Sequence, residues 1–105
     1  MKYTIEEMFR NLPLPANEKW KEGVWDVEPF KKENLTLVFF APRGTDYQTA
    51  HEEDEFYFIA RGKADLIVAD ERFSSETGDC FFVSAGEKHH FENISDDFAT
   101  WAIFF

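Results

Sequence analysis

From Leu35 onward, short apolar runs rich in aromatic and β-branched residues alternate with polar turns. Residues of these types are enriched in strands, and Gly, Pro, Asn and Asp favour the turns between them. The runs predict six strands, at residues 35–41, 55–61, 64–69, 80–83, 89–93 and 98–105. Several short strands at this spacing, with almost no helical pattern, predict an all-β sandwich or barrel.

The first thirty residues have a different pattern. Thr4 followed by Glu7 is typical of a capping box and predicts a short helix over residues 5–10. After it, the chain mixes Lys, Glu and Trp without a clear period, although residues 23–27 suit a short edge strand. We therefore expect an N-terminal arm, residues 1–30, packed on a barrel of residues 31–105.

Composition sharpens the expected partners. The chain has 13 Phe, 3 Trp and 3 Tyr, more aromatic surface than one small core needs, and this predicts a homodimer formed through a sheet face. Its net charge of −10 argues against nucleic acid and anionic membranes as partners, because phosphate binding needs a basic surface.

The single cysteine, Cys80, excludes an intramolecular disulfide, and at the start of a strand it is expected to fill the core. No apolar run approaches the ~20 residues of a membrane span. Glu6 and Glu7 stand where a signal peptide would need its apolar segment, so we expect a cytoplasmic protein.

Three potential metal ligands stand out: His51, Glu55 and His89. Side chains two apart in a strand share a face, so Glu55 shares the core-directed face of Tyr57, and His89 that of Phe91. A carboxylate is rarely buried unless it is paired or bound to a cation. The alternatives are a solvated acidic loop at residues 52–55 and a histidine pair with no metal.

The spacing of these residues resembles the two motifs of the cupin superfamily. Residues 49–62 match the first motif, with His51 at its second histidine, Glu55 at its glutamate and Gly62 at its closing glycine. Residues 78–93 match the second motif, with its histidine at His89. The resemblance implies the double-stranded β-helix, or jelly-roll barrel, of that superfamily.

The resemblance also implies a divalent metal held by His51, Glu55 and His89, with Fe, Mn, Ni, Zn and Cu all compatible. Thr49 stands where family members usually supply a further histidine. Two interpretations follow. In the first, the metal site keeps three protein ligands and leaves the other coordination positions open. In the second, the site is too weak to hold a metal, and the barrel binds an organic molecule without metal or binds no ligand. Gln48, Asp46 and Glu52 are nearby substitutes, but strand parity favours none of them except through a loop.

The inward strand faces predict a pocket lined by Thr49, Tyr57, Phe82, Phe91 and Trp101, with Ile103 a weaker candidate. Tyr57 is the candidate catalytic residue, because a buried phenol needs a hydrogen-bond partner and can orient a substrate. Arg43 is read either as a partner for an anionic substrate or as a solvated turn residue.

These residues predict a metal-dependent cupin that acts on or binds a small organic molecule, through oxygenase, isomerase or lyase-like chemistry. The alternative is a non-catalytic binding or structural cupin with a degenerate metal site. Fold alone does not decide between them.

Overall fold

A computed structural model of the chain describes residues 1–21, 23–46 and 48–105. It contains one helix, α1 (Ile5–Arg10), and eight strands, which are β1 (Asp26–Lys32), β2 (Leu35–Phe40), β3 (Glu55–Arg61), β4 (Lys63–Val68), β5 (Glu71–Glu76), β6 (Cys80–Val83), β7 (His89–Glu92) and β8 (Ala99–Phe104). The all-β expectation is confirmed, as is the helix, where Thr4 accepts a hydrogen bond from the Glu7 N–H.

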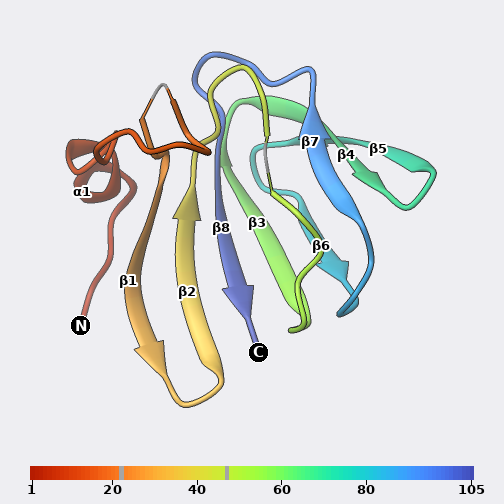
Figure 1. Cartoon of the computed structure of the whole chain (residues 1–105), viewed down its shortest axis with the longest axis horizontal. Coiled ribbons are helices and arrows are strands. Elements are labelled where there is room, and N and C mark those ends of the chain that lie inside the picture. The colour runs from red at the N-terminus through yellow and green to blue at the C-terminus, as the bar shows by residue number, and fades with distance from the viewer. Residues whose placement is uncertain (22, 47) are drawn as a thin grey trace.

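The strands form two antiparallel sheets that face each other. The larger sheet has the order β1-β2-β8-β3-β6, and the smaller one has the order β5-β4-β7. In Figure 1 the larger sheet fills the left and centre and the smaller one lies to the right. The main core lies between them and includes Phe40, Tyr57, Leu66, Phe91 and Phe98.

A second, smaller core lies on the outer face of the larger sheet, beneath the helix. Met8 of α1 packs there with Phe39, Ala60 and Ala99, and Trp25 and Trp101 pack against them. The alternation of side chains along β2, β3 and β8 thus divides their apolar residues between the two cores. Burying one such large side chain contributes roughly 1.5–3 kcal/mol, which explains how a six-residue helix is held in place.

Two strands lie outside the predicted set. β1 begins at Asp26, inside the segment expected to be an arm, and pairs with β2. Its polar residues and Pro29 hide its strand character, and its pairing has a register shift between Val27 and Phe30. β5 has the polar sequence ERFSSE, and no strand was predicted there.

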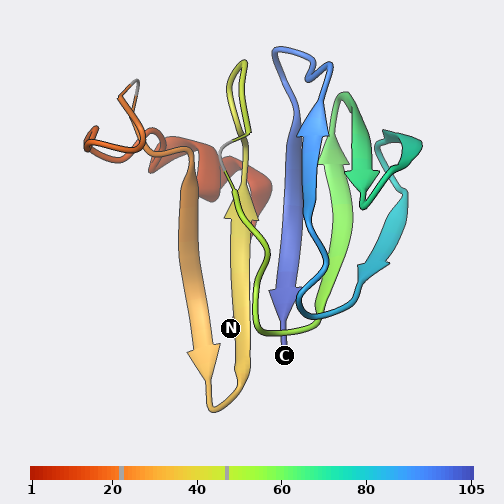
Figure 2. The ribbon, with the colours of Figure 1, turned by 45° about the vertical axis from the view of Figure 1, so that its right-hand side comes forward.

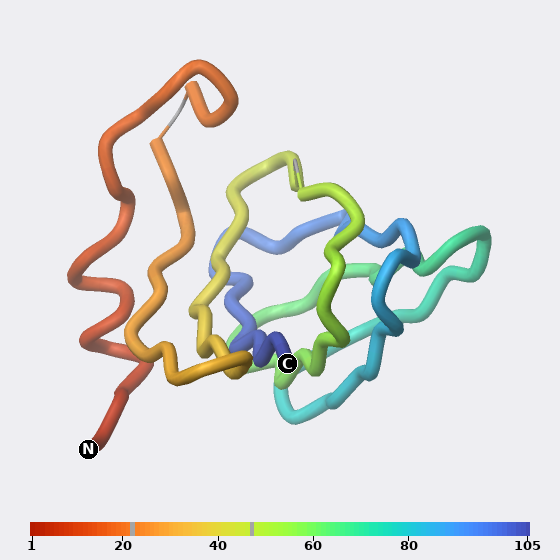
Figure 3. Tube along the Cα trace, turned by 60° about the horizontal axis from the view of Figure 1, so that its bottom comes forward, coloured from red at the N-terminus to blue at the C-terminus, as the bar shows by residue number. Residues whose placement is uncertain are grey.

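The connection from β2 to β3, residues 41–54, positions the site. β2 and β3 both pair antiparallel with β8, so they run in the same direction and the connection must return along the sheet. Figures 1 and 2 show it descending to the start of β3, and in Figure 3 it reaches toward β7. Within the described residues, no helix is both long and apolar enough to cross a membrane.

Candidate metal centre

The structure brings His51, Glu55 and His89 together inside the barrel. One potential ligand atom from each lies within 4.8 Å of the others. Glu55 opens β3 and is 1% exposed, and His89 opens β7 and is 4% exposed. His51 lies on the β2–β3 connection and is partly buried. Two sheets and one connection therefore each contribute one side chain.

Backbone pairing places these residues side by side. Glu55 is opposite Val83 on β6, and both point into the core. The Gly86 N–H donates to the His51 carbonyl oxygen at 2.7 Å, which ties His51 to the turn that leads into β7. Gly86 has φ of 80°, a left-handed conformation that glycine adopts without strain.

The facing atoms of Glu55 and His89 need a cation or a proton between them. His89 Nδ1 lies 2.9 Å from the Glu87 carbonyl oxygen, which can only accept, so Nδ1 carries the hydrogen. In the neutral ring, Nε2 then presents a lone pair toward Glu55 Oε1 at 2.9 Å. This contact lacks the angles of a hydrogen bond, so His89 Nε2 and both Glu55 oxygens have no hydrogen-bond partner among the described residues.

The electrostatics of His89 agree with this geometry. Burial alone would lower the pKa of His89, but the Glu55 carboxylate and the Glu87 carbonyl oxygen raise it, and the net shift is upward. The pair therefore attracts positive charge. A divalent metal ion would supply more positive charge than one proton, and it would interact with all three side chains of the cluster.

A hydrogen-bonded network lies beside the cluster. The Tyr57 hydroxyl donates to Gln48 Oε1 at 3.0 Å, and Gln48 Nε2 donates to Asp46 Oδ2 at 2.7 Å. Burial, followed by the Glu55 and Asp46 charges, raises the pKa of Tyr57 well above its usual value, so Tyr57 remains a neutral phenol. Gln48 also lies 3.5 Å from His51, measured from Oε1 to Nε2.

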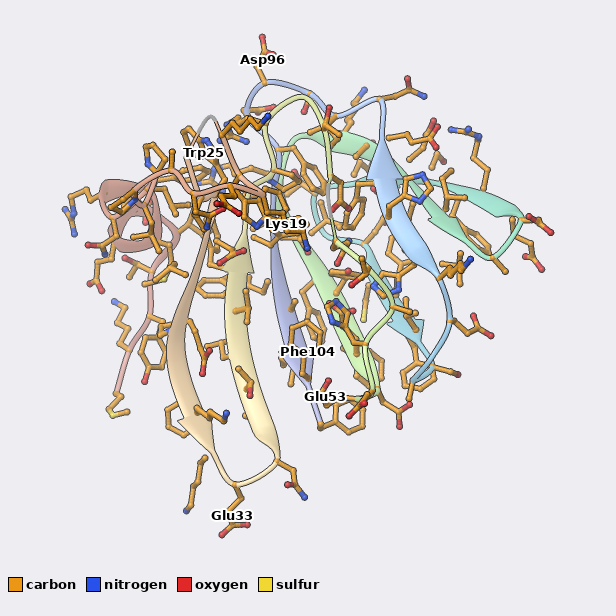
Figure 4. All side chains as sticks on the ribbon, in the orientation of Figure 1. Lys19, Trp25, Glu33, Glu53, Asp96 and Phe104 are labelled. Carbon is orange, nitrogen blue, oxygen red and sulfur yellow. The ribbon has the colours of Figure 1, made fainter. Side chains whose placement is uncertain are left out.

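A cavity of about 310 Å³ opens beside the cluster. Its polar end is formed by Gln48, Thr49, His51 and Glu55. Its apolar wall comes from inward side chains of β2 and β8, namely Val38, Phe40, Ala102 and Phe104. Its remaining lining comes from the arm and β1, namely Lys19, Trp20, Asp26 and Glu28. Figure 4 labels two of these residues, Lys19 and Phe104.

The part of the lining that comes from the arm and β1 carries mixed charge. Burial and then the Glu28 charge raise the pKa of Asp26, while Lys19 lowers it. Lys19 also lies 5.4 Å from the centre of the Trp20 ring. The cavity thus combines an apolar wall with several polar and charged side chains, an arrangement that suits a small molecule carrying polar groups.

Two of the expected pocket residues lie in the core behind the cluster. Tyr57 and Phe91 are 0% and 2% exposed, and their ring centres are 5.0 Å apart. Neither lines the cavity, whereas Thr49 does. Tyr57 therefore reaches the site through Gln48.

Three other expected pocket residues lie on the outer face of the larger sheet. Trp101 packs at 4.9 Å on Phe39 in the core beneath α1. Ile103 lines an outer surface pocket near the N-terminus. Phe82 is 51% exposed. The register explains these errors, because Phe104 and Val83, one residue along from Ile103 and Phe82, are the inward-facing residues.

Two further expectations are settled by the same geometry. Cys80 is exposed, so the prediction that it fills the core was wrong; it lies opposite Phe58 on the outer face. Arg43 is partly buried and does not line the cavity. It donates to the Phe98 carbonyl oxygen at 2.8 Å and stacks on Trp25 at 4.6 Å, which makes it part of the packing of the arm.

The residues that sequence reasoning missed are those supplied by the arm and β1. Lys19, Asp26 and Glu28 line the cavity, although nothing in their local pattern sets them apart from a solvated segment. The pairing of β1 with β2 brings Asp26 and Glu28 there. The sequence did indicate a short strand at residues 23–27, which overlaps the start of β1, but it did not indicate that this strand continues to residue 32.

Comparison with known proteins agrees with this architecture. An uncharacterised protein of Streptomyces coelicolor is 30% identical over 98 residues, which cover 91% of this chain and 92% of that protein. A Cupin 2 conserved barrel domain protein from Salinispora arenicola superposes with a TM-score of 0.70 at 15% identity, over 100% of this chain and 87% of that one. The DMSP lyase DddQ from Ruegeria pomeroyi gives 0.59 at 22% identity, over 70% and 39%.

The structural likenesses concern the fold, and the sequence match establishes the family. Residues 36–105 match the Cupin domain family, a segment that contains all three residues of the cluster and every strand except β1 and the first residue of β2. The chain therefore belongs to the cupin family.

Proposed function

We propose that this cupin binds a divalent transition metal through His51, Glu55 and His89, and that a small organic molecule occupies the adjacent cavity and is transformed there. The observation that carries the proposal is the pair of buried lone pairs, on Glu55 and His89, that face each other without a hydrogen bond. Leaving a buried carboxylate without a partner costs several kcal/mol.

The donor set fits such an ion. Two imidazoles and one carboxylate suit borderline divalent metals, with Fe, Mn, Ni, Zn and Cu all acceptable, and the same set occurs in facial triads with open positions. When bound, the ion would act as a Lewis acid or as a site for O₂. Oxygenase, isomerase and lyase reactions all use such chemistry, and the site does not distinguish between them.

The chain's own residues would bind and orient the small molecule. Val38, Phe40 and Phe104 provide apolar contact and exclude water from one side of the cavity. Lys19 and Asp26 also line the cavity, and they offer a cation and a carboxyl group to polar substituents. The DMSP lyase among the structural neighbours is an example of an enzyme on this fold.

A second candidate function is non-catalytic binding of a small molecule in the same cavity. Thr49 favours it, because a neutral hydroxyl lies at the cavity wall where the family resemblance implies an imidazole. This candidate predicts ligand binding that does not change when metal is removed.

We also propose that the partner protein is a second copy of this chain. Phe58, Phe82 and Phe105 on the outer sheet face are 42%, 51% and 45% exposed. Phe56 joins the last two in one cluster, with ring centres 5.2 and 5.8 Å away. A two-fold contact needs only one self-complementary face, and exposed aromatic clusters of this kind are typical of interfaces. Light scattering tests this: a mass near 12.4 kDa would contradict a dimer.

Metal analysis of the purified protein tests the main proposal. We expect close to one transition-metal ion per chain after reconstitution and its loss in His51→Ala. The matched control is His90→Ala, which removes a neighbouring imidazole on the outer face of β7 and should leave the metal content unchanged. Substoichiometric metal in the wild-type protein that His51→Ala does not alter would contradict the proposal.

A further inference from the structure

We propose that the side-chain carbonyl oxygen of Gln48 is a fourth protein ligand of the metal, in place of the imidazole missing at position 49. This inference rests on the proposed metal function and adds a residue outside the three-member cluster. It starts from the β2–β3 connection, where Gln48 and Thr49 both line the polar end of the cavity. Strand parity favoured no substitute for the missing imidazole except through a loop, and Gln48 lies outside the strands, on this connection.

The distance between Gln48 and His51 suits two ligands of a shared ion. Metal–nitrogen and metal–oxygen bonds of about 2.0–2.2 Å, at tetrahedral to right angles, separate neighbouring ligand atoms by roughly 3.0–3.5 Å. Gln48 Oε1 lies 3.5 Å from His51 Nε2. That spacing is at the outer limit for a hydrogen bond and within the range for two ligands of one ion.

The orientation of the amide is fixed by Asp46. Its Oδ2 accepts from Gln48 Nε2 at 2.7 Å, and its Oδ1 accepts from the Gln48 backbone N–H at 2.9 Å. Asp46 Oδ2 also accepts from the Phe91 backbone N–H at 2.7 Å. All three contacts use N–H donors, which suits an ionised carboxylate, so the amide nitrogen must face Asp46 and the oxygen must face the cluster.

This arrangement also ties Gln48 to the strand that carries His89. Phe91 lies two residues beyond His89 on β7 and shares its inner face. The carbonyl oxygen of Gln48 has two acceptor positions, and Tyr57 takes one of them at 3.0 Å. The other remains available on the side of His51. Tyr57 is thus a positioning residue for Gln48 in this account.

The competing interpretation is that Gln48 only orients His51. Metal affinity alone does not separate the two, because removing a residue that orients a ligand already weakens binding by about 10–100-fold. The deciding quantity is what the ion itself contacts. A lost protein ligand is replaced by water, and the number of metal-bound waters then rises by one.

The experiment compares wild-type protein with Gln48→Leu and with Thr49→Val, a matched control at the neighbouring position. Each is loaded with Mn²⁺ for water-proton relaxation and with Co²⁺ for its visible spectrum. We expect Gln48→Leu to gain one bound water and change the Co²⁺ band positions, and Thr49→Val to match the wild type. Six-coordinate Mn²⁺ should keep about two waters in the wild-type protein if four side chains bind and about three if only three do.

The outcomes separate this inference from the proposed function. Stoichiometric metal in the wild type, with identical water counts and spectra in Gln48→Leu, would overturn the assignment of Gln48 and leave the three-residue site standing. About three bound waters in the wild type would do the same without any variant, should Gln48→Leu fail to fold. No stoichiometric binding of either ion by the wild type would overturn both.

Discussion

His89 and His90 are neighbours on β7, and each has a carboxylate oxygen close to its Nε2 atom. Glu55 lies 2.9 Å from His89, and both side chains are 2% exposed. Glu92 lies 2.6 Å from His90, with side chains 41% and 42% exposed. The chemical groups are the same, and the strand's alternation puts one pair inside the barrel and the other on its surface.

The outer pair is satisfied by ordinary contacts. His90 and Glu92 form a hydrogen bond, and Arg72 also donates to Glu92 at 3.0 Å. Both contacts lower the pKa of Glu92. In the inner pair, by contrast, His89 Nε2 and both Glu55 carboxylate oxygens have no hydrogen-bond partner among the described residues. Burial, and not residue type, therefore distinguishes a candidate metal site from a surface ion pair.

The largest expected effect is on the stability of the metal-free protein. In the metal-free protein Glu55 raises the pKa of His89, so a protonated His89 is the partner that offsets the buried carboxylate. His89→Ala removes that positive charge, and we expect it to lose about 3 kcal/mol of unfolding free energy. His90→Ala should change stability little, because its pair is solvated. Urea denaturation with a chelator present measures both. Equal losses in the two variants would remove the energetic distinction between the pairs.

Metal-dependent stabilisation should differ in the same way. At a free metal concentration 100 times the Kd, wild-type protein should gain about 2.7 kcal/mol. His90→Ala should keep that gain, and His51→Ala should lose it. Thermal unfolding at increasing Zn²⁺ or Mn²⁺ concentrations gives the comparison. A gain retained in His51→Ala would place the bound ion elsewhere.

Removing the anchor of Gln48 should have a smaller effect. Asp46→Asn weakens two hydrogen bonds to Gln48 and one that ties the connection to Phe91 of β7, but it changes none of the three cluster residues. We expect metal affinity to fall by about 10-fold, because the partners of metal ligands tune binding to this degree. Competition with a chromogenic chelator measures it, and Glu52→Gln on the exposed part of the same connection serves as control. An unchanged affinity in Asp46→Asn would show that this anchor is dispensable.

The smallest effect concerns the surface network and its pH dependence. Hydrogen bonds from Asn93 and Arg72 lower the pKa of Asp65, and those from His90 and Arg72 lower the pKa of Glu92. A lowered carboxyl pKa adds stability above the unfolded values, near 3.8 and 4.5, and this stability is lost as pH falls through the folded values. The small stability difference between wild type and Arg72→Gln should therefore be present at pH 6 and shrink toward pH 3. A difference that grows with acid would contradict these directions.

The inner pair could be predicted from sequence because it depends on local information. Alternation along β3 and β7, with the spacing of the cupin motifs, determines which faces Glu55 and His89 share. Trp101 and Phe82 were placed wrongly because β8 and β6 are apolar on both faces, so their sequences do not identify the inward side. Only the pairing of Glu55 with Phe104 and Val83 fixes it.

The cavity lining supplied by the arm and β1 could not be predicted from the sequence for a different reason. Lys19 and Asp26 come to the cavity through the path of the arm and the pairing of β1, which are tertiary effects without a local pattern. Gln48 was named from the sequence only as a nearby substitute, because the orientation of its side chain is also a tertiary effect. Its side chain is directed by Asp46, whose own position depends on the distant Phe91 backbone.

A crystal structure of the metal-loaded protein, with anomalous diffraction recorded at the absorption edge of the ion, tests the central claim most directly. We predict one strong anomalous peak between His51, Glu55 and His89, about 2.0–2.3 Å from a donor atom of each, and none between His90 and Glu92. Ordered water or no density between Glu55 and His89 in fully loaded crystals, or a peak only at the outer pair, would contradict the account.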